Sequence, residues 1–125
     1  MDTQRIFPGL AVSDIGAAHA FYADVLGLPV TEEHGFLTLD LGDGGHLFVY
    51  GKDNHVPAQH TVLNFEVPDV DAAVDELASK GVEMLRYDGM HQDERGIVRP
   101  ANPDEGPDIG WFADPSGNVI AVMQG

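Results

Sequence analysis

Hydrophobic residues recur at helical spacing in two stretches of this chain, and the same short motif opens each stretch. The segment "VSDIGAAHAFYADVLG" begins at Val12, and the segment "VPDVDAAVDELASKG" begins at Val67. Both read Val-x-Asp-(Ile/Val)-x-Ala-Ala, continue as an amphipathic run and end on glycine. A polar start and a glycine stop are typical of a helix. The chain is therefore predicted to repeat itself, with one helix in each half.

Alternating apolar and polar residues follow each predicted helix, which is typical of half-buried strands. The segments "FLTLDLGDGGHLFVYG" (36–51) and "IGWFADPSGNVIAVMQG" (109–125) each hold two such runs around a turn. In the second segment, the quartet Asp114–Gly117 has the residue preferences of a type I turn. Each half is predicted to contain a strand, a helix and about three more strands. One helix cannot cover both faces of such a sheet, so the halves are expected to combine, with helices outside and a concave sheet face inside.

The repeated pieces resemble the vicinal oxygen chelate family, which includes glyoxalase I, bleomycin-resistance proteins and extradiol dioxygenases. The matching pieces are "GLAVSDIGAAHAFYADVLGL", "LNFEVPDVDAAVDELASKGV" and "WFADPSGNVIAVMQ", and they cover most of the chain. The resemblance implies an α+β fold in which two paired βαβββ modules form a U-shaped mixed sheet around a cavity, with the helices outside. Residues 1–125 would form a single domain, with module one at about 1–55 and module two at about 56–125. Pro57 and the polar run "GKDNHVPAQH" predict the junction.

Composition narrows the classes of function. The chain has 21 acidic and 6 basic residues, a net charge of −15, which argues against nucleic-acid binding. That charge favours a cationic ligand by long-range attraction, although acidic residues spread along a chain also serve solubility. Cysteine is absent, so thiolate chemistry is excluded. No membrane span or signal peptide is recognisable, and a cytoplasmic location is expected.

The resemblance also points to four positions where metal-using members of the family place His or Glu ligands. They lie five residues before each repeated Val, three residues after Asn118 and at the matching point of the first hairpin. In this sequence the four positions are occupied by Phe7, Phe48, Val62 and Ala121. None of these side chains donates a lone pair to a divalent ion. The sequence therefore predicts no metal and no cofactor, with Ala121 in the floor of an apolar cavity.

Strand alternation extends this cavity face to further residues. Phe36, His46, Val119 and Met123 are expected on it, whereas Leu37, Leu39 and Leu41 are expected to point toward the helices. The predicted ligand-binding residues are Phe7, Thr38, Asp40, Phe48, Tyr50, His60, Val62, Asn64, Glu66, Trp111 and Ala121.

A long segment without periodicity, residues 87–108, precedes the last hairpin. It carries His91, Arg95 and Arg99 as candidates for an anion contact. Loops of this length are uncommon unless they are functional or disordered, so the segment is either a lid or a surface loop.

Three functions remain open from the sequence. The leading hypothesis is a metal-independent protein that binds a small, flat and cationic compound, as a homodimer that covers its exposed sheet edges. The alternative is a lyase, isomerase or dioxygenase with a non-standard metal site built from His46, His60 and another group. Glu66 cannot join His60 at one ion, because six strand residues span roughly 20 Å. The third is a structural or interaction protein whose cavity is filled by side chains. Catalytic residues are not identified.

Overall fold

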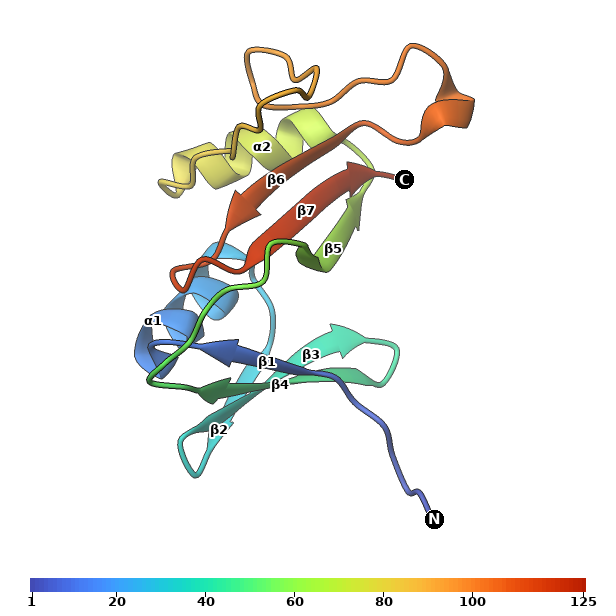
Figure 1. Ribbon diagram of the computed structural model, residues 1–125. Coiled ribbons are helices and arrows are strands. Elements are labelled where there is room, and N and C mark those ends of the chain that lie inside the picture. The colour runs from blue at the N-terminus through green and yellow to red at the C-terminus, as the bar shows by residue number, and fades with distance from the viewer. The chain divides into compact units, whose positions relative to one another are not determined.

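The computed structural model describes residues 1–125, and the chain divides into two compact units, residues 1–57 (unit 1) and 58–125 (unit 2). Together they hold seven strands in two sheets and two α-helices, a mixed α+β architecture (Figure 1). The α+β class and the repeat of strand, helix and hairpin predicted from the sequence are confirmed. Neither helix is long and apolar enough to cross a membrane.

Unit 1 contains a four-stranded sheet with the order β1-β4-β3-β2. β1 runs parallel to β4, and the other neighbours are antiparallel. Helix α1 runs into a π-helical turn, η1, and α1 contacts β3 and β4. The elements are β1 (Gly9–Val12), α1 (Ile15–Ala20), η1 (Phe21–Val25), β2 (Val30–Glu33), β3 (Phe36–Gly42) and β4 (Gly45–Gly51).

Unit 2 repeats this plan with a three-stranded sheet of order β5-β7-β6, in which β5 is parallel to β7 and β6 is antiparallel to it. Its elements are β5 (Thr61–Val67), α2 (Val70–Ser79), the 3₁₀ turn η2 (Pro103–Glu105), β6 (Ile109–Ala113) and β7 (Val119–Gln124).

Unit 2 has no regular fourth strand beside β6, where unit 1 has β2 beside β3. The backbone N–H of Leu85 donates to the carbonyl of Trp111 at 2.7 Å, which joins the segment after α2 to β6. The side chain of Gln92 forms hydrogen bonds with the neighbouring backbone groups. Its Nε2 donates to the Leu85 carbonyl, and its Oε1 accepts from the N–H of Tyr87. These backbone groups are therefore satisfied by a side chain of the loop instead of a strand ladder.

Both helices begin as the repeated motif predicts. Asp14 Oδ1 accepts a hydrogen bond from the N–H of Ala17 at 3.0 Å, and Asp69 Oδ1 accepts one from Ala72 at 3.1 Å. Each carboxylate thereby satisfies a backbone donor that has no partner within the helix. Gly81, which follows α2, adopts a positive φ of 84° that glycine tolerates best.

Strand register confirms the internal repeat. Gly9 pairs with Phe48 in unit 1, and Asn64 pairs with Ala121 in unit 2. Counted from the repeated Val, Gly9 and Asn64 are equivalent, so Phe48 and Ala121 are equivalent too. The sequence alignment of Phe48 with Ala121 is therefore matched by the pairing of the strands.

The turn before β7 is held by one buried carboxylate. Asp114 is 4% exposed, and its Oδ1 accepts from the backbone N–H groups of Ser116 and Asn118, each at 2.9 Å. Its Oδ2 accepts from Asn118 Nδ2, also at 2.9 Å. The Gly117 N–H donates to the Asp114 carbonyl at 3.0 Å, which closes the predicted turn.

The helix side of the unit 1 sheet carries fully buried aliphatic residues, as alternation predicts for Leu37 and Leu39, with Val49 beside them. Leu41 was expected among them, and that expectation is wrong, because Leu41 is 41% exposed. The register of β3 and β4 shifts between Asp40 and Gly42, and such an irregularity ends the alternation that the prediction relied on.

Candidate functional site

Four aromatic side chains gather on the side of the unit 1 sheet opposite α1. Phe48 and Tyr50 alternate in β4 with Leu47 and Val49, which are buried on the helix side. Phe36 begins β3, and Phe7 lies in the segment that leads into β1. We call the surface formed by Phe7, Phe36, Phe48 and Tyr50 the aromatic face.

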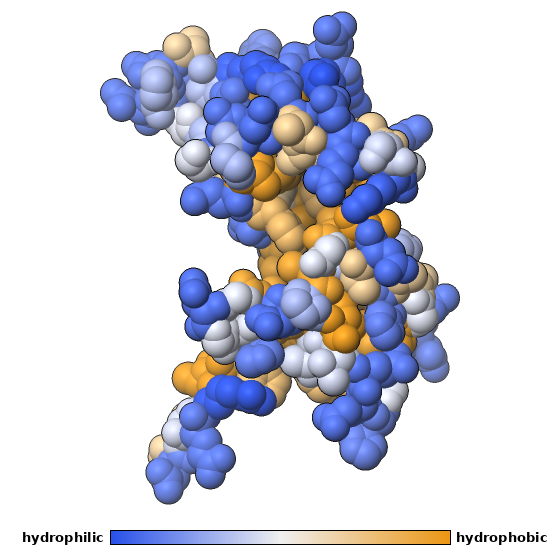
Figure 2. All heavy atoms as spheres, turned by 180° about the vertical axis from the view of Figure 1, so that it is seen from behind, coloured by the Kyte–Doolittle hydropathy of each residue, from blue (hydrophilic) through white to orange (hydrophobic).

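Phe48 lies at the centre of the aromatic face. Its ring centroid is 6.2 Å from that of Phe7 in an edge-on contact, 5.1 Å from Phe36 and 6.3 Å from Tyr50, to which it is nearly parallel. Phe7 and Phe36 remain 43% and 44% exposed. The rings thus support each other while part of their area stays open to a ligand, and Figure 2 shows hydrophobic surface beside the N-terminal segment.

A pocket of about 360 Å³ adjoins the aromatic face on the same side of the sheet. Cross-strand register joins the two, because Thr38 pairs with Phe48 and Glu33 pairs with Phe36. We call this the polar pocket, and it is lined by Arg5, Pro29, Thr31, Glu33, Thr38, Asp40 and His46.

The polar pocket brings both signs of charge together. The Arg5 guanidinium lies over the Phe7 ring, with its central carbon 4.8 Å from the centroid. Asp40 Oδ1 accepts a hydrogen bond from the Gly42 N–H at 2.8 Å. His46 Nδ1 is buried without a hydrogen-bond partner. The arrangement suits charge recognition next to an apolar ring platform.

Of the predicted site residues in unit 1, Thr38, Asp40, Phe48 and Tyr50 lie on this side of the sheet, and Phe7 joins them from the preceding segment. Sequence reasoning missed Arg5, Thr31 and Glu33. The dipeptide His34-Gly35 was the sequence signal that could have placed Glu33 opposite Phe36, because it forms a two-residue hairpin turn with both residues at positive φ.

The predicted residues of unit 2 fall into two groups. Asn64, Ala121 and Trp111 pair across the three strands and share one face, and Glu66 pairs with Met123 on that face as well. Ala121 is fully buried. The Trp111 ring contacts the Tyr87 ring edge-on, with 5.6 Å between their centroids. Strand alternation does not predict this contact, because Tyr87 lies outside the strands.

Alternation fails at the start of β5. The register shifts between Thr61 and Leu63, so that Thr61 stands opposite Val119 and Val62 is the extra residue. The face assigned to Val62 and His60 by counting in twos is therefore not supported. His60 lies before β5 and is exposed.

The four positions that correspond to the family's metal ligands offer no donor atoms in this chain. Phe7 and Phe48 are ring partners in unit 1, and Val62 and Ala121 are aliphatic residues of unit 2. No group of three or more His, Cys, Asp or Glu residues is placed to hold a metal ion. The residues present therefore do not fit the family's metal.

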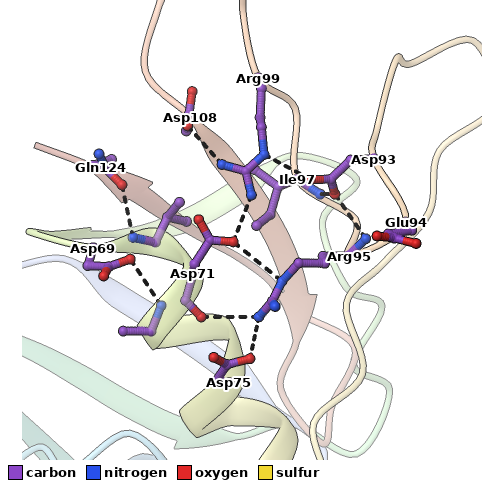
Figure 3. A network of polar contacts seen from close by, with 12 residues as sticks. Asp69, Asp71, Asp75, Asp93, Glu94, Arg95, Ile97, Arg99, Asp108 and Gln124 are labelled. Carbon is purple, nitrogen blue, oxygen red and sulfur yellow. Dashed lines mark hydrogen bonds and ion pairs between the residues drawn. The ribbon is translucent and has the colours of Figure 1, made fainter.

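Arg95 and Arg99 were candidates for an anion contact, but in the structure both are already paired with carboxylates (Figure 3). Arg95 is paired with Asp71 and Asp75 of α2. Arg99 bonds Asp71 at 2.7 Å, and it also contacts Asp93 at 2.9 Å and Asp108 at 3.1 Å. Both guanidinium groups are engaged by carboxylates of unit 2, and they bind the segment 93–99 to the first turns of α2.

The pKa values in this network shift as its geometry requires. Burial opposes ionisation of Asp93, but the Ile97 N–H and the Arg99 side chain donate to its carboxylate, so its pKa is held below the usual range. Hydrogen bonds to Asp71 and Asp93 raise the pKa of Arg99. The network is thus stable as charged pairs near neutral pH.

Comparisons with known proteins agree on the fold. The family model of the Glyoxalase/Bleomycin resistance protein/Dioxygenase superfamily matches residues 5–122. No curated protein matches the chain.

Three crystal structures illustrate the likeness. TnmS3, an antibiotic binding protein from Streptomyces sp. CB03234, is 21% identical with a TM-score of 0.66, covering 99% of this chain and 98% of that one. FosX, a genomically encoded fosfomycin resistance protein from Listeria monocytogenes, is 15% identical with a TM-score of 0.73, at 100% and 95% coverage. An integron cassette protein from the mobile metagenome of a Halifax Harbour sewage outfall is 18% identical with a TM-score of 0.70, at 98% and 99% coverage. At these identities the likeness shows a shared fold.

Proposed function

The chain belongs to the Glyoxalase/Bleomycin resistance protein/Dioxygenase superfamily, and from that premise we propose that it binds a flat, largely apolar small molecule without a metal ion. The aromatic face carries this proposal. Phe48 contacts three other rings, and two of those rings are almost half exposed. Such a group of rings is a platform on which a planar ligand can stack.

The size of the platform is sufficient for useful affinity. Covering about 150 Å² of apolar area contributes about 4 kcal/mol at roughly 25 cal/mol per Å². Ring stacking adds about 0.5–1.5 kcal/mol per aromatic pair. The loss of translational and rotational freedom on association opposes these terms, so we expect a single small ring system to bind in the micromolar to millimolar range.

The chemistry of the four family positions supports the proposal that binding needs no metal. Phenyl, isopropyl and methyl groups supply none of the nitrogen, oxygen or sulfur donors that a divalent ion needs. In unit 1, two of these positions instead provide the Phe7–Phe48 ring contact. The same place in the fold thus favours stacking over coordination. The alternative enzyme with a site built from His46 and His60 gains no support, because neither belongs to a cluster of metal-binding side chains.

Positive charge on the ligand should help binding. Glu33 and Asp40 line the polar pocket beside the rings, and the chain carries a net charge of −15. The long-range part of this attraction weakens as salt rises past about 0.15 M, where the screening length is about 8 Å.

TnmS3, an antibiotic binding protein with this fold, gives precedent for a binding role, although a shared fold does not set the ligand.

A thermal-shift series with three compounds of one ring system tests the proposal. We expect 9-aminoacridine, a cation, to raise the melting temperature more than neutral acridone or anionic acridine-9-carboxylate. The advantage of 9-aminoacridine should shrink between 0.05 and 0.5 M salt, and added chelator should change nothing. If none of the three stabilises the protein, the binding proposal fails.

We further propose a cytoplasmic homodimer. β5 ends its sheet with an unpaired edge, and an exposed edge is a liability that association removes. Light scattering at micromolar concentration should give about twice the 13.4 kDa chain mass; the mass of a single chain would contradict the dimer.

A further inference from the structure

Arg5 differs from the other lysine and arginine side chains of the protein. The chain has six Lys and Arg residues. Lys80, Arg95 and Arg99 are paired with carboxylates, Arg86 donates to the carbonyls of Asp93 and Glu94, and Lys52 donates to Asn54. The Arg5 side chain alone makes no hydrogen bond and no ion pair. Its guanidinium group contacts the Phe7 ring.

This unpaired cation is unexpected in so acidic a protein. With 21 carboxylates in the chain, an exposed arginine has many potential partners. Arg5 instead lies where the aromatic face meets the polar pocket, over Phe7 and among the pocket's lining residues. Its guanidinium has five donors in a planar fork that matches a carboxylate. The position therefore leaves an anion-binding group open next to a ring platform.

The same pocket holds carboxylates without cationic partners. Glu33 and Asp40 both line it, and neither forms an ion pair with Arg5 or with any other residue. All three side chains are exposed to water. An anionic ligand alone would meet the repulsion of the two carboxylates, and a cationic ligand alone would meet the repulsion of Arg5. A ligand with both charges complements all three side chains.

We propose that the polar pocket binds a zwitterionic head group, with the ligand's carboxylate on Arg5 and its ammonium beside Glu33, while Asp40 adds negative charge farther along β3. This inference rests on the proposed function, because it takes the ligand's flat body to lie on the aromatic face. It narrows the ligand to an aromatic compound with an amino-acid-like head. Arg5 is then the residue that distinguishes such a compound from a simple aromatic amine.

Four indoles separate the contributions of the two charges. Tryptophan carries both charges, tryptamine only the ammonium, indole-3-propionate only the carboxylate, and indole neither. Isothermal titration should show tryptophan binding about fivefold tighter than tryptamine or indole-3-propionate, a value in the range of exposed ion pairs.

Variants assign the charges to residues. Arg5→Gln should weaken tryptophan and indole-3-propionate about fivefold and leave tryptamine no weaker, whereas Glu33→Gln should weaken tryptophan and tryptamine. Lys52→Gln removes the same charge from the same unit outside the pocket and should change none of the four. Because the Arg5 side chain forms no hydrogen bond within the protein, its replacement should not disturb folding.

The outcomes separate this inference from the proposed function. If tryptamine binds as tightly as tryptophan, or if Arg5→Gln and Lys52→Gln weaken tryptophan equally, the zwitterion assignment is overturned while the aromatic face stands. If none of the four indoles and none of the acridines binds, the proposed function itself is wrong.

Discussion

Replacing Phe48 by leucine is the most direct test of the aromatic face. The side chain touches three other rings, at centroid distances of 6.2, 5.1 and 6.3 Å. Each aromatic pair contributes about 0.5–1.5 kcal/mol beyond its buried area. Three pairs together contribute about 1.5–4.5 kcal/mol. Because Phe7 and Phe36 are almost half exposed and leucine keeps most of the apolar volume, we expect the lower end, a loss of about 1.5–2 kcal/mol in the free energy of unfolding, measured by urea denaturation.

Binding should fall by a comparable amount. A planar ligand on Phe48 loses one stacking contact worth about 0.5–1.5 kcal/mol, which corresponds to about a two- to tenfold weaker affinity. The assay is a fluorescence titration with 9-aminoacridine at a temperature where the variant is folded.

Tyr87→Leu provides the matched control, because it removes an exposed aromatic of unit 2 that contacts Trp111 and lies outside the aromatic face. Its affinity for 9-aminoacridine should equal that of the wild type. If Phe48→Leu loses stability as expected but binds like the control, the rings serve packing alone and the reasoning is refuted.

Two further predictions concern stability. Asp114→Ala should lower the free energy of unfolding by about 2–4 kcal/mol in urea, because three hydrogen bonds to a buried carboxylate are lost and their donors stay buried; a loss below about 1 kcal/mol would contradict this role. Because the pKa of Asp93 is lowered on folding, its ionised form stabilises the protein above pH 3.8 and this contribution is lost as the pH falls further. The difference in unfolding free energy between wild type and Asp93→Asn should therefore be larger at pH 6 than at pH 3, and an equal difference at both would show that Asp93 ionisation is not coupled to folding.

Local signals in the sequence were sufficient for much of the fold. Helix starts at Asp14 and Asp69 and the turn at Asp114 are governed by contacts within a few residues, so their residue types identify them. The repeat then aligned Phe48 with Ala121, and in the structure these two residues pair with the equivalent residues Gly9 and Asn64.

Alternation was reliable only where a strand is regular. One shift in register at the end of β3 exposed Leu41, and another at the start of β5 removed the basis for assigning Val62 and His60 to a face. A single extra residue inverts every later assignment in a period of two, and nothing in the local composition announces it.

Charge partners could not be predicted, because they depend on contacts between residues far apart in the sequence. Arg99 meets Asp71, 28 residues away, and is therefore unavailable to an anion. Arg5 lies in an aperiodic segment that gave no reason to place it near β2 and β3. The sequence could not show which arginines are paired, because only the tertiary structure separates Arg95 and Arg99, which meet carboxylates, from Arg5, which does not.

The residues at the family's ligand positions change how selectivity can arise in this protein. A metal ion fixes a ligand by direction and coordination number, whereas the Phe7–Phe48 contact offers a surface that accepts many planar rings. Discrimination must then come from polar groups at the edge of that surface. Arg5, Glu33 and Asp40 are charged groups in that place, and none of them has an opposite charge to neutralise it. A ligand that covers one of these exposed charges without matching it removes water from that charge and supplies no partner. These three side chains are therefore where a change of residue should change which ligand binds.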